Sequence, residues 1–111
     1  MKKSTITMLA LVAAFIFSTV ALGAGPDGAV LFKQKCVACH GADASGATPA
    51  GQKLKIRDLR SVDVQKQTDD QLFDIIANGG PSKRPTHIFK AKGLTDADVK
   101  ALVTYIRSIK K

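Results

Sequence analysis

The chain has 111 residues and carries 17 Lys and Arg against nine Asp and no Glu, which gives a formal net charge of +8. This length holds one small domain, and small domains often need a metal, a disulfide or a cofactor to complete their core. These features argue against a large enzyme with its own substrate domain, a multi-span membrane protein and a repeat array. The 45% hydrophobic content argues against a disordered chain.

A charged start, an apolar centre and a run of small residues indicate a targeting segment at the N-terminus. Two lysines precede an uncharged stretch, and residues 8–17 are its most apolar part. Ala21 and Gly23 fit a small-x-small cleavage pattern, with the next alanine as the alternative last residue. We therefore predict a signal peptide at residues 1–24, cleaved near residue 23 or 24, and one domain at residues 25–111.

Export predicts a periplasmic location and changes the composition of the remaining chain. The net charge falls from +8 to +6, because Lys2 and Lys3 leave with the signal. Both methionines, Met1 and Met8, also leave, so the remaining chain contains none. The alternative is an uncleaved membrane anchor, because the uncharged window is just long enough to span a bilayer.

The first helix of the domain is predicted at residues 27–35, with Pro26 near its start. Gly28 and Phe32 are four residues apart and therefore share one face of this helix. The helix leads directly into the two cysteines of the chain.

Cys36, Cys39 and His40 form a Cys-x-x-Cys-His run, the attachment signature of a c-type haem. At this spacing two thioethers reach the two vinyl groups on one edge of the porphyrin, and the following His places its imidazole under the iron. We therefore predict one covalent haem c, with Cys36 and Cys39 as thioether residues and His40 as the proximal iron ligand. A thioredoxin-like dithiol or a simple disulfide is the alternative, but no alternating strand pattern supplies the context for a thioredoxin motif.

The segment after the motif is predicted to be irregular. Residues 41–51 are rich in Gly and small residues, which is typical of a loop. Residues 54–59 alternate weakly between apolar and polar side chains. This pattern predicts either a short strand or an irregular stretch that packs Leu54, Ile56 and Leu59 inward.

Two amphipathic helices complete the chain, separated by a loop at residues 81–93. The first begins with a capping box at residues 68–71 and ends at the Asn-Gly-Gly of residues 78–80. The second begins with a similar box at residues 95–98. Their apolar stripes are Leu72, Ile75 and Ile76 in the first helix, and Val99, Leu102, Val103 and Ile106 in the second.

Over the whole of residues 25–111 the chain resembles the class I c-type cytochromes. In that family a Gly and an aromatic residue precede the first Cys by eight and four positions, which Gly28 and Phe32 match. The family packs this helix across a C-terminal helix that carries an aromatic residue, which Tyr105 matches. The resemblance implies an all-α, small cytochrome c fold of three to four helices wrapped around one covalently bound haem. The expected haem pocket consists of Leu31, Phe32, Leu54, Ile56, Leu59, Leu72, Ile76, Ile88, Phe89, Leu94, Val99, Leu102 and Ile106.

The resemblance also implies a group that orients the proximal imidazole. The family has a proline in the loop after the motif, and the carbonyl of this proline holds the ligand. Pro49 is the candidate here for the contact to His40. A hydrogen bond of this kind fixes the tautomer and orientation of a metal-bound imidazole.

The chain departs from the family on the distal side of the haem, where a loop before the last helix usually supplies a Met. His/Met ligation is excluded if the signal is removed. Counting back from Leu94 places His87 at the Met position, whereas counting from Phe89 with a different gap places Thr86 there. Because imidazole is a good ligand for haem iron and a hydroxyl is a poor one, we predict His87 as the distal ligand. The alternatives are an open or water-bound site and a lysine of the same loop, namely Lys83, Lys90 or Lys92.

Two filled axial positions leave no room for a substrate, so we predict an electron carrier and not an enzyme. Imidazole in place of Met lowers the potential of the haem, which predicts a low-potential carrier. Two alternatives stay open. One is a ligand-binding haem protein or small haem enzyme with an open distal site, and the other is a haem subunit of a membrane oxidoreductase.

Basic residues crowd the loop beside the predicted distal ligand. They are Lys83, Arg84, Lys90 and Lys92. A cluster of basic residues around the haem site can steer redox proteins with acidic docking surfaces toward it, although the same residues could simply keep the loop solvated. We expect such redox partners, a monomer and no nucleic-acid binding, with weak attraction to an anionic membrane surface as a further expectation.

Overall fold

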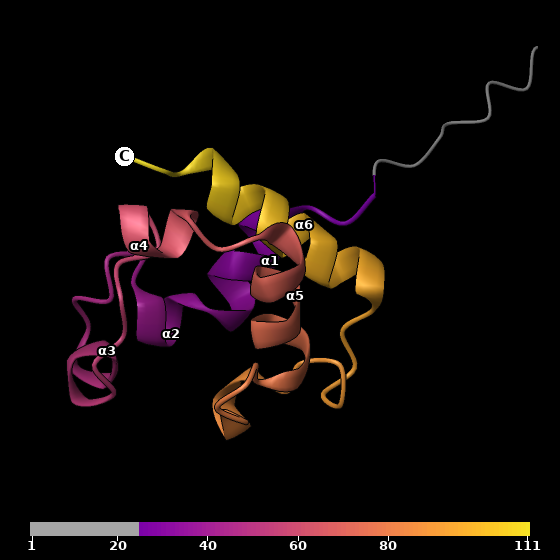
Figure 1. Ribbon diagram of the computed structural model, residues 1–111, viewed down its shortest axis with the longest axis horizontal. Helices are drawn as coiled ribbons and strands as arrows, with labels where there is room; N and C mark the ends of the chain where they lie inside the picture. The colour runs from indigo at the N-terminus through magenta and orange to yellow at the C-terminus, as the bar shows by residue number, and fades with distance from the viewer. Residues whose placement is uncertain (1–24) are drawn as a thin grey trace, which may run out of the picture.

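The computed structural model describes residues 25–111, in which all regular structure is helical (Figure 1). The elements are α1 (Gly28–Lys35), α2 (Val37–His40), α3 (Pro49–Lys53), α4 (Val62–Gln65), α5 (Asp69–Asn78), the 3-10 helix η1 (Pro85–His87) and α6 (Asp96–Ser108). The predicted all-α class is confirmed, with three helices of eight residues or more and several short ones. The predicted signal peptide at residues 1–24 lies outside the described residues. Within residues 25–111 no helix is long and apolar enough to cross a bilayer.

Helix α1 begins one residue later than predicted, because Asp27 is its N-cap and not its first helical residue. The Asp27 carboxylate accepts hydrogen bonds from the backbone N–H groups of Ala29 and Val30. This satisfies two of the backbone donors that a helix start leaves free. The helix ends at Lys35, and Cys36, with a non-helical φ of −120°, separates it from the short helix α2.

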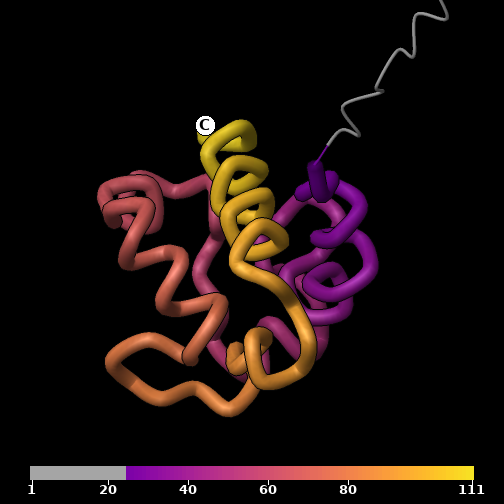
Figure 2. The backbone as a smooth tube through the Cα atoms, turned by 90° about the vertical axis from the view of Figure 1, so that its right-hand side faces the viewer, coloured from indigo at the N-terminus to yellow at the C-terminus, as the bar shows by residue number. Residues whose placement is uncertain are grey.

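The crossing of α1 over α6 is the most extensive contact between two helices, and it brings the two ends of the domain together (Figures 1 and 2). Gly28 permits the close approach, since a Cβ atom there would clash with the Ala101 carbonyl oxygen. Beside this point the rings of Phe32 and Tyr105 pack with centroids 5.0 Å apart. The predicted pairing of the N-terminal helix with the aromatic C-terminal helix is therefore confirmed.

Helices α5 and α6 begin at the two capping boxes predicted from the sequence. Thr68 and Gln71 exchange side-chain and backbone hydrogen bonds at the start of α5. Thr95 and Asp98 make the same exchange at the start of α6. Helix α5 ends at Gly79, whose φ of 90° is the left-handed conformation that Gly adopts without strain.

The apolar stripe of α6 forms the centre of the core. Its buried residues are Val99, Leu102, Val103 and Ile106, as the periodicity predicts. Leu102 packs with Phe32 of α1 on one side, whereas Val103 and Ile106 pack with Leu72 of α5 on the other. Helix α6 therefore joins the two halves of the fold.

The segment between the motif and α5 is more ordered than the sequence predicts. The predicted loop at residues 41–51 ends early, because Pro49 occupies the first position of α3, where its fixed φ favours a helix. Helix α4 was not predicted, since four residues give too short a pattern to recognise. Residues 54–59 form no strand, which leaves the irregular stretch of the two predicted alternatives.

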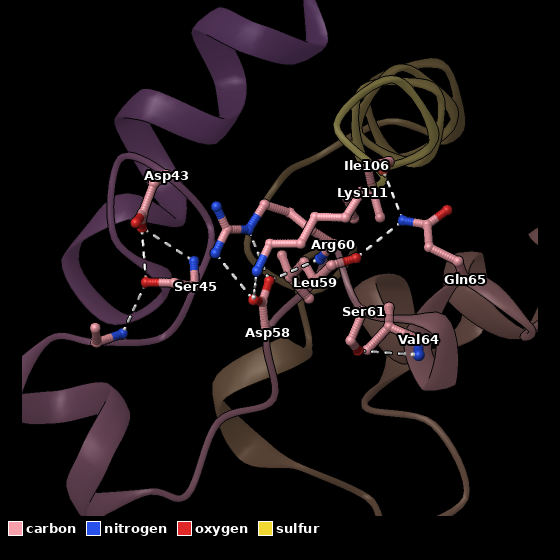
Figure 3. Close-up of polar contacts among 11 residues, drawn as sticks. Asp43, Ser45, Asp58, Leu59, Arg60, Ser61, Val64, Gln65, Ile106 and Lys111 are labelled. Carbon is pink, nitrogen blue, oxygen red and sulfur yellow. Dashed lines mark hydrogen bonds and ion pairs between the residues drawn. The ribbon is translucent and has the colours of Figure 1, made fainter.

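Polar contacts fasten this middle segment to α6 (Figure 3). The Gln65 side-chain amide donates hydrogen bonds to the carbonyl oxygens of Leu59 and Ile106, both at 2.9 Å. The Asp58 carboxylate accepts from Arg60 at 2.9 Å and from Lys111 at 3.4 Å. Because the Gln65–Ile106 and Asp58–Lys111 contacts join residues far apart in the chain, they fix where residues 58–65 lie against α6 and the residues that follow it.

A Gly28→Ala variant should destabilise the fold by about 1 to 3 kcal/mol, because the new Cβ would press into the Ala101 carbonyl. Thermal or denaturant unfolding of the purified variant measures this effect. The matched control is Gly25→Ala, because a Cβ at Gly25 has no neighbour within 4 Å. Equal stability of the two variants would show that the crossing tolerates a side chain at Gly28.

Candidate functional site

A cavity of about 500 Å³ lies among α1, α2, α5, η1, α6 and the segment after α3. Its size falls within the range of small-molecule and cofactor sites. It brings together all three residues of the Cys-x-x-Cys-His signature and His87, which is 47 positions from His40 in the sequence and so meets it only through the fold.

The apolar wall agrees in large part with the predicted pocket. Nine predicted residues line the cavity, namely Phe32, Leu54, Ile56, Leu59, Leu72, Ile76, Phe89, Leu102 and Ile106. Four predicted residues do not line it, namely Leu31, Ile88, Leu94 and Val99. Val99 is fully buried in the core, and Ile88 is 37% exposed at the surface. The lining also includes Val64 and Ile75, which the sequence analysis did not assign.

The two cysteines are free thiols on the cavity wall, held at the junction of α1 and α2. A disulfide is therefore not formed between them in this structure. Burial raises the pKa of the Cys36 thiol to about 11, with a smaller effect from the neighbouring Cys39.

His40 is the last residue of α2 and is buried against the ring of Phe32, with centroids 6.2 Å apart. Its Nδ1 atom is buried and has no hydrogen-bond partner among the described residues. Burial, and secondarily the nearby His87, lower the pKa of His40 to about 4. The imidazole is therefore neutral near pH 7, which is the form that binds metals.

The backbone of the motif is held by three residues that the sequence analysis did not single out. The Gly46 N–H donates to the His40 carbonyl at 2.7 Å, and the Thr48 hydroxyl donates to the Cys39 carbonyl at 2.6 Å. At Gly51 a Cβ atom would lie 2.6 Å from the Cys39 carbonyl oxygen. The sequence pattern that could have pointed to this segment is Thr48 followed by Pro49, since Thr before Pro is a typical helix start.

Pro49 lies in the loop region predicted for it but makes no hydrogen bond to His40 here. It is exposed at the first position of α3, and the His40 Nδ1 atom has no partner among residues 25–111. The orienting role of the Pro49 carbonyl therefore stays a prediction.

His87 ends the 3-10 helix η1 and faces His40. Their ring centroids are 5.9 Å apart and their planes differ by 14°. The Nδ1 atom of His87 is also buried without a partner among the described residues. Burial lowers the pKa of His87, and the positive charges of Arg84 and Lys92 lower it further, so this imidazole is also held neutral.

The distance between the two rings fits a single metal ion between them. A transition metal binds an imidazole nitrogen at about 2 Å, so two rings on opposite sides of one metal would have centroids roughly 6 Å apart. The apolar wall, the two thiols and the pair of neutral imidazoles therefore fit a haem held through sulfur on one side and ligated on both faces.

The competing distal residues are placed less favourably than His87. Thr86 lines the cavity, but its hydroxyl is a weak ligand for haem iron. Lys90 pairs with Asp96 at 2.8 Å, and the Lys92 ammonium lies 5.1 Å from the centre of the Phe89 ring. Lys83, Lys90 and Lys92 do not line the cavity.

Comparison with known proteins shows that the chain belongs to the cytochrome c family, whose model matches residues 26–110. The solved structure of the Kustc0563 c-type cytochrome is 37% identical over 77% of this chain and 99% of that chain, with a TM-score of 0.65. A point mutant of Kustc0563 is 37% identical over 76% of this chain and 99% of that chain, with a TM-score of 0.62. A comparison with curated protein sequences found no match.

The family and the fold together define the class of this protein. It is a class I c-type cytochrome with the small all-α fold, and its cofactor is a covalently attached haem c with iron. As a member of this family it is a haem-based electron carrier that works with redox partners.

A Thr48→Val variant should lose both the N-cap of α3 and the hydrogen bond to the Cys39 carbonyl. We expect a loss of about 1 to 2 kcal/mol in the free energy of unfolding. Thermal unfolding measures the effect, and Thr48→Ser is the matched control because it keeps the hydroxyl. If Val and Ser gave the same stability, the hydroxyl would not be what holds the motif.

Proposed function

We propose that this chain is an exported monohaem cytochrome that carries single electrons at low potential, with one haem bound by two histidines. Cys36 and Cys39 attach the haem through thioethers, His40 is the proximal iron ligand and His87 is the distal ligand. The observation that carries the proposal is the opposition of two neutral imidazoles at 5.9 Å beside the two thiols.

The bound haem supplies a one-electron couple between ferric and ferrous iron. His40 and His87 would hold the iron through their imidazoles, which would leave no place at the iron for a substrate. The apolar wall, with Phe32 and Leu102 among its buried members, keeps water away from the centre. The residues of this chain therefore support electron transfer through the haem edge instead of bond-making at the metal.

The ligand pair also determines whether the midpoint potential of the haem lies above or below that of other family members. Met as an axial ligand raises the potential of a haem, whereas two imidazoles favour the ferric state. The chain lacks Met throughout residues 25–111, so no Met can replace His87 after the predicted signal is removed. This is why we propose a potential below that of the usual His/Met members.

Export and partners complete the proposal. The N-terminal signal pattern supports a periplasmic location, where a covalent haem would not dissociate from its protein. Arg84 lines the cavity, and Lys83, Lys90 and Lys92 lie in the same loop, so the basic charge lies close to the haem site. We propose redox partners with acidic docking surfaces, which this charge would attract over several ångströms at physiological salt.

A His87→Met variant should raise the midpoint potential, on the order of 100 mV within the roughly 0.8 V span that axial ligands control. A spectroelectrochemical titration measures this shift. Thr86→Val is the matched control, because Thr86 is the neighbouring cavity residue and the alternative position in the sequence count. An unchanged midpoint in His87→Met, or a large shift in Thr86→Val, would refute the assignment of His87.

Carbon monoxide binding separates the carrier from a ligand-binding haem protein. The reduced wild-type protein should resist carbon monoxide, because His87 occupies the distal position. A His87→Ala variant should bind the gas rapidly and show a high-spin spectrum when oxidised. Rapid binding by the wild type, or a high-spin oxidised wild type, would favour a haem enzyme or gas-binding protein with an open site.

A further inference from the structure

The side chain of Lys92 turns back onto the loop that carries His87. Its ammonium donates a hydrogen bond to the Thr86 carbonyl oxygen at 3.5 Å and lies 5.1 Å from the centre of the Phe89 ring. Its backbone N–H donates to the carbonyl oxygens of Ile88 and Phe89, at 3.3 and 3.1 Å. Lys92 therefore closes the loop around His87 with both its main chain and its side chain.

The two side-chain contacts of Lys92 fall on opposite sides of His87 in the sequence. Thr86 immediately precedes His87, and Phe89 follows it by two positions. The Phe89 ring lines the cavity and lies 6.3 Å from the His87 ring, with the two planes at 37°. The Phe89 N–H donates to the Ile76 carbonyl of α5 at 3.2 Å, so the residue beside His87 is itself anchored. One ammonium thus joins the peptide before the imidazole to the aromatic ring beside it.

The other lysines of residues 81–93 make different contacts. Lys90 reaches out of the loop and pairs with Asp96 of α6 at 2.8 Å. Lys83 and Lys92 form no ion pair with a carboxylate of residues 25–111, and residues 81–93 contain no Asp or Glu. No neighbouring carboxylate in the loop therefore competes for the Lys92 charge, and a carbonyl oxygen and an aromatic face attract it instead.

We propose that Lys92 is a positioning residue for the distal ligand, which it holds through Thr86 and Phe89. This inference rests on the proposed function, because it takes His87 as that ligand. The contact at Thr86 restrains the backbone just before His87, and the contact at Phe89 restrains the ring against which the imidazole can turn. Together they resist rotation of the His87 ring away from its near-parallel alignment with His40, in which the planes differ by 14°.

Two measurements on the haem-loaded protein report this positioning directly. In a ferric haem with two imidazole ligands, the angle between the imidazole planes determines the spread of the g values in electron paramagnetic resonance. In the ferrous haem, carbon monoxide binds only after the distal ligand leaves, so its binding rate reports how firmly that ligand is held. A lysine that merely solvated the loop or attracted a redox partner would change neither measurement.

The first variant is Lys92→Ala, made as holoprotein with covalent haem. Its low-spin resonance should broaden and shift from the rhombic spectrum expected of near-parallel planes in the wild type. Carbon monoxide should bind the reduced variant about twofold to fivefold faster, the size of effect that a cation over an exposed aromatic ring supports. Lys92→Arg should restore both properties, because a guanidinium keeps the charge and also stacks on aromatic faces. If Lys92→Ala does not mature, Lys92→Gln removes the charge and keeps much of the stem.

A double-variant comparison tests whether Lys92 acts through Phe89. Phe89→Leu removes the aromatic face, and the combined Phe89→Leu/Lys92→Ala variant removes both partners. Lys92→Ala should accelerate carbon monoxide binding less in the Phe89→Leu background than in the wild type, because contacting residues are not additive. Full additivity of the two changes would show that Lys92 does not act through the ring.

The matched control is Lys83→Ala, which removes a charge from the same loop at a residue off the cavity wall. It should keep the wild-type resonance and binding rate. If Lys83→Ala and Lys92→Ala gave equal changes, the effect would be one of loop charge and the inference would be wrong. The inference is also wrong if Lys92→Ala keeps both wild-type properties while its haem is attached and low-spin, and the proposed function then stands. If the wild type carries no covalent low-spin haem, the proposed function itself fails.

Discussion

Two imidazoles that face each other across an apolar cavity, one buried and one half-buried, are the feature on which the rest of the structure depends. His40 and His87 lie 5.9 Å apart, and each has a buried Nδ1 atom with no partner in residues 25–111. Buried polar atoms are normally paired, so such a site is costly for the chain alone. A cofactor that fills the cavity could bind the rings through their other nitrogens, and the neutral state of both imidazoles prepares them for it.

The helices around the cavity serve to hold these two rings at the required distance. The tight crossing at Gly28 fixes α1 on α6, and α1 leads into the short helix that ends at His40. On the other side, the backbone N–H groups of Phe89 and Lys90 donate to carbonyl oxygens of α5, which anchors the loop that carries His87. Helix α6 packs against both sides, so one helix sets the spacing of the two walls.

The sequence predicted the parts of the fold that rest on local chemistry. The capping boxes at Thr68 and Thr95 and the apolar stripe of α6 are local patterns, and all were confirmed. Helix α4 and the contact of Thr48 with the Cys39 carbonyl were missed, because one is only four residues long and the other joins residues that only the fold brings together. The same limit applies to the site. The motif at Cys36 was recognisable from spacing alone, whereas the choice of His87 over Thr86 depended on a count across a loop.

The most direct test of the central claim is mass spectrometry of the protein matured in a host that attaches c-type haem. The account predicts a chain that begins at residue 24 or 25 and carries the added mass of one haem. After proteolysis that mass should map to the peptide containing Cys36 and Cys39, with no thiol left to alkylate. Free thiols on both cysteines and no added tetrapyrrole would contradict the account at its base.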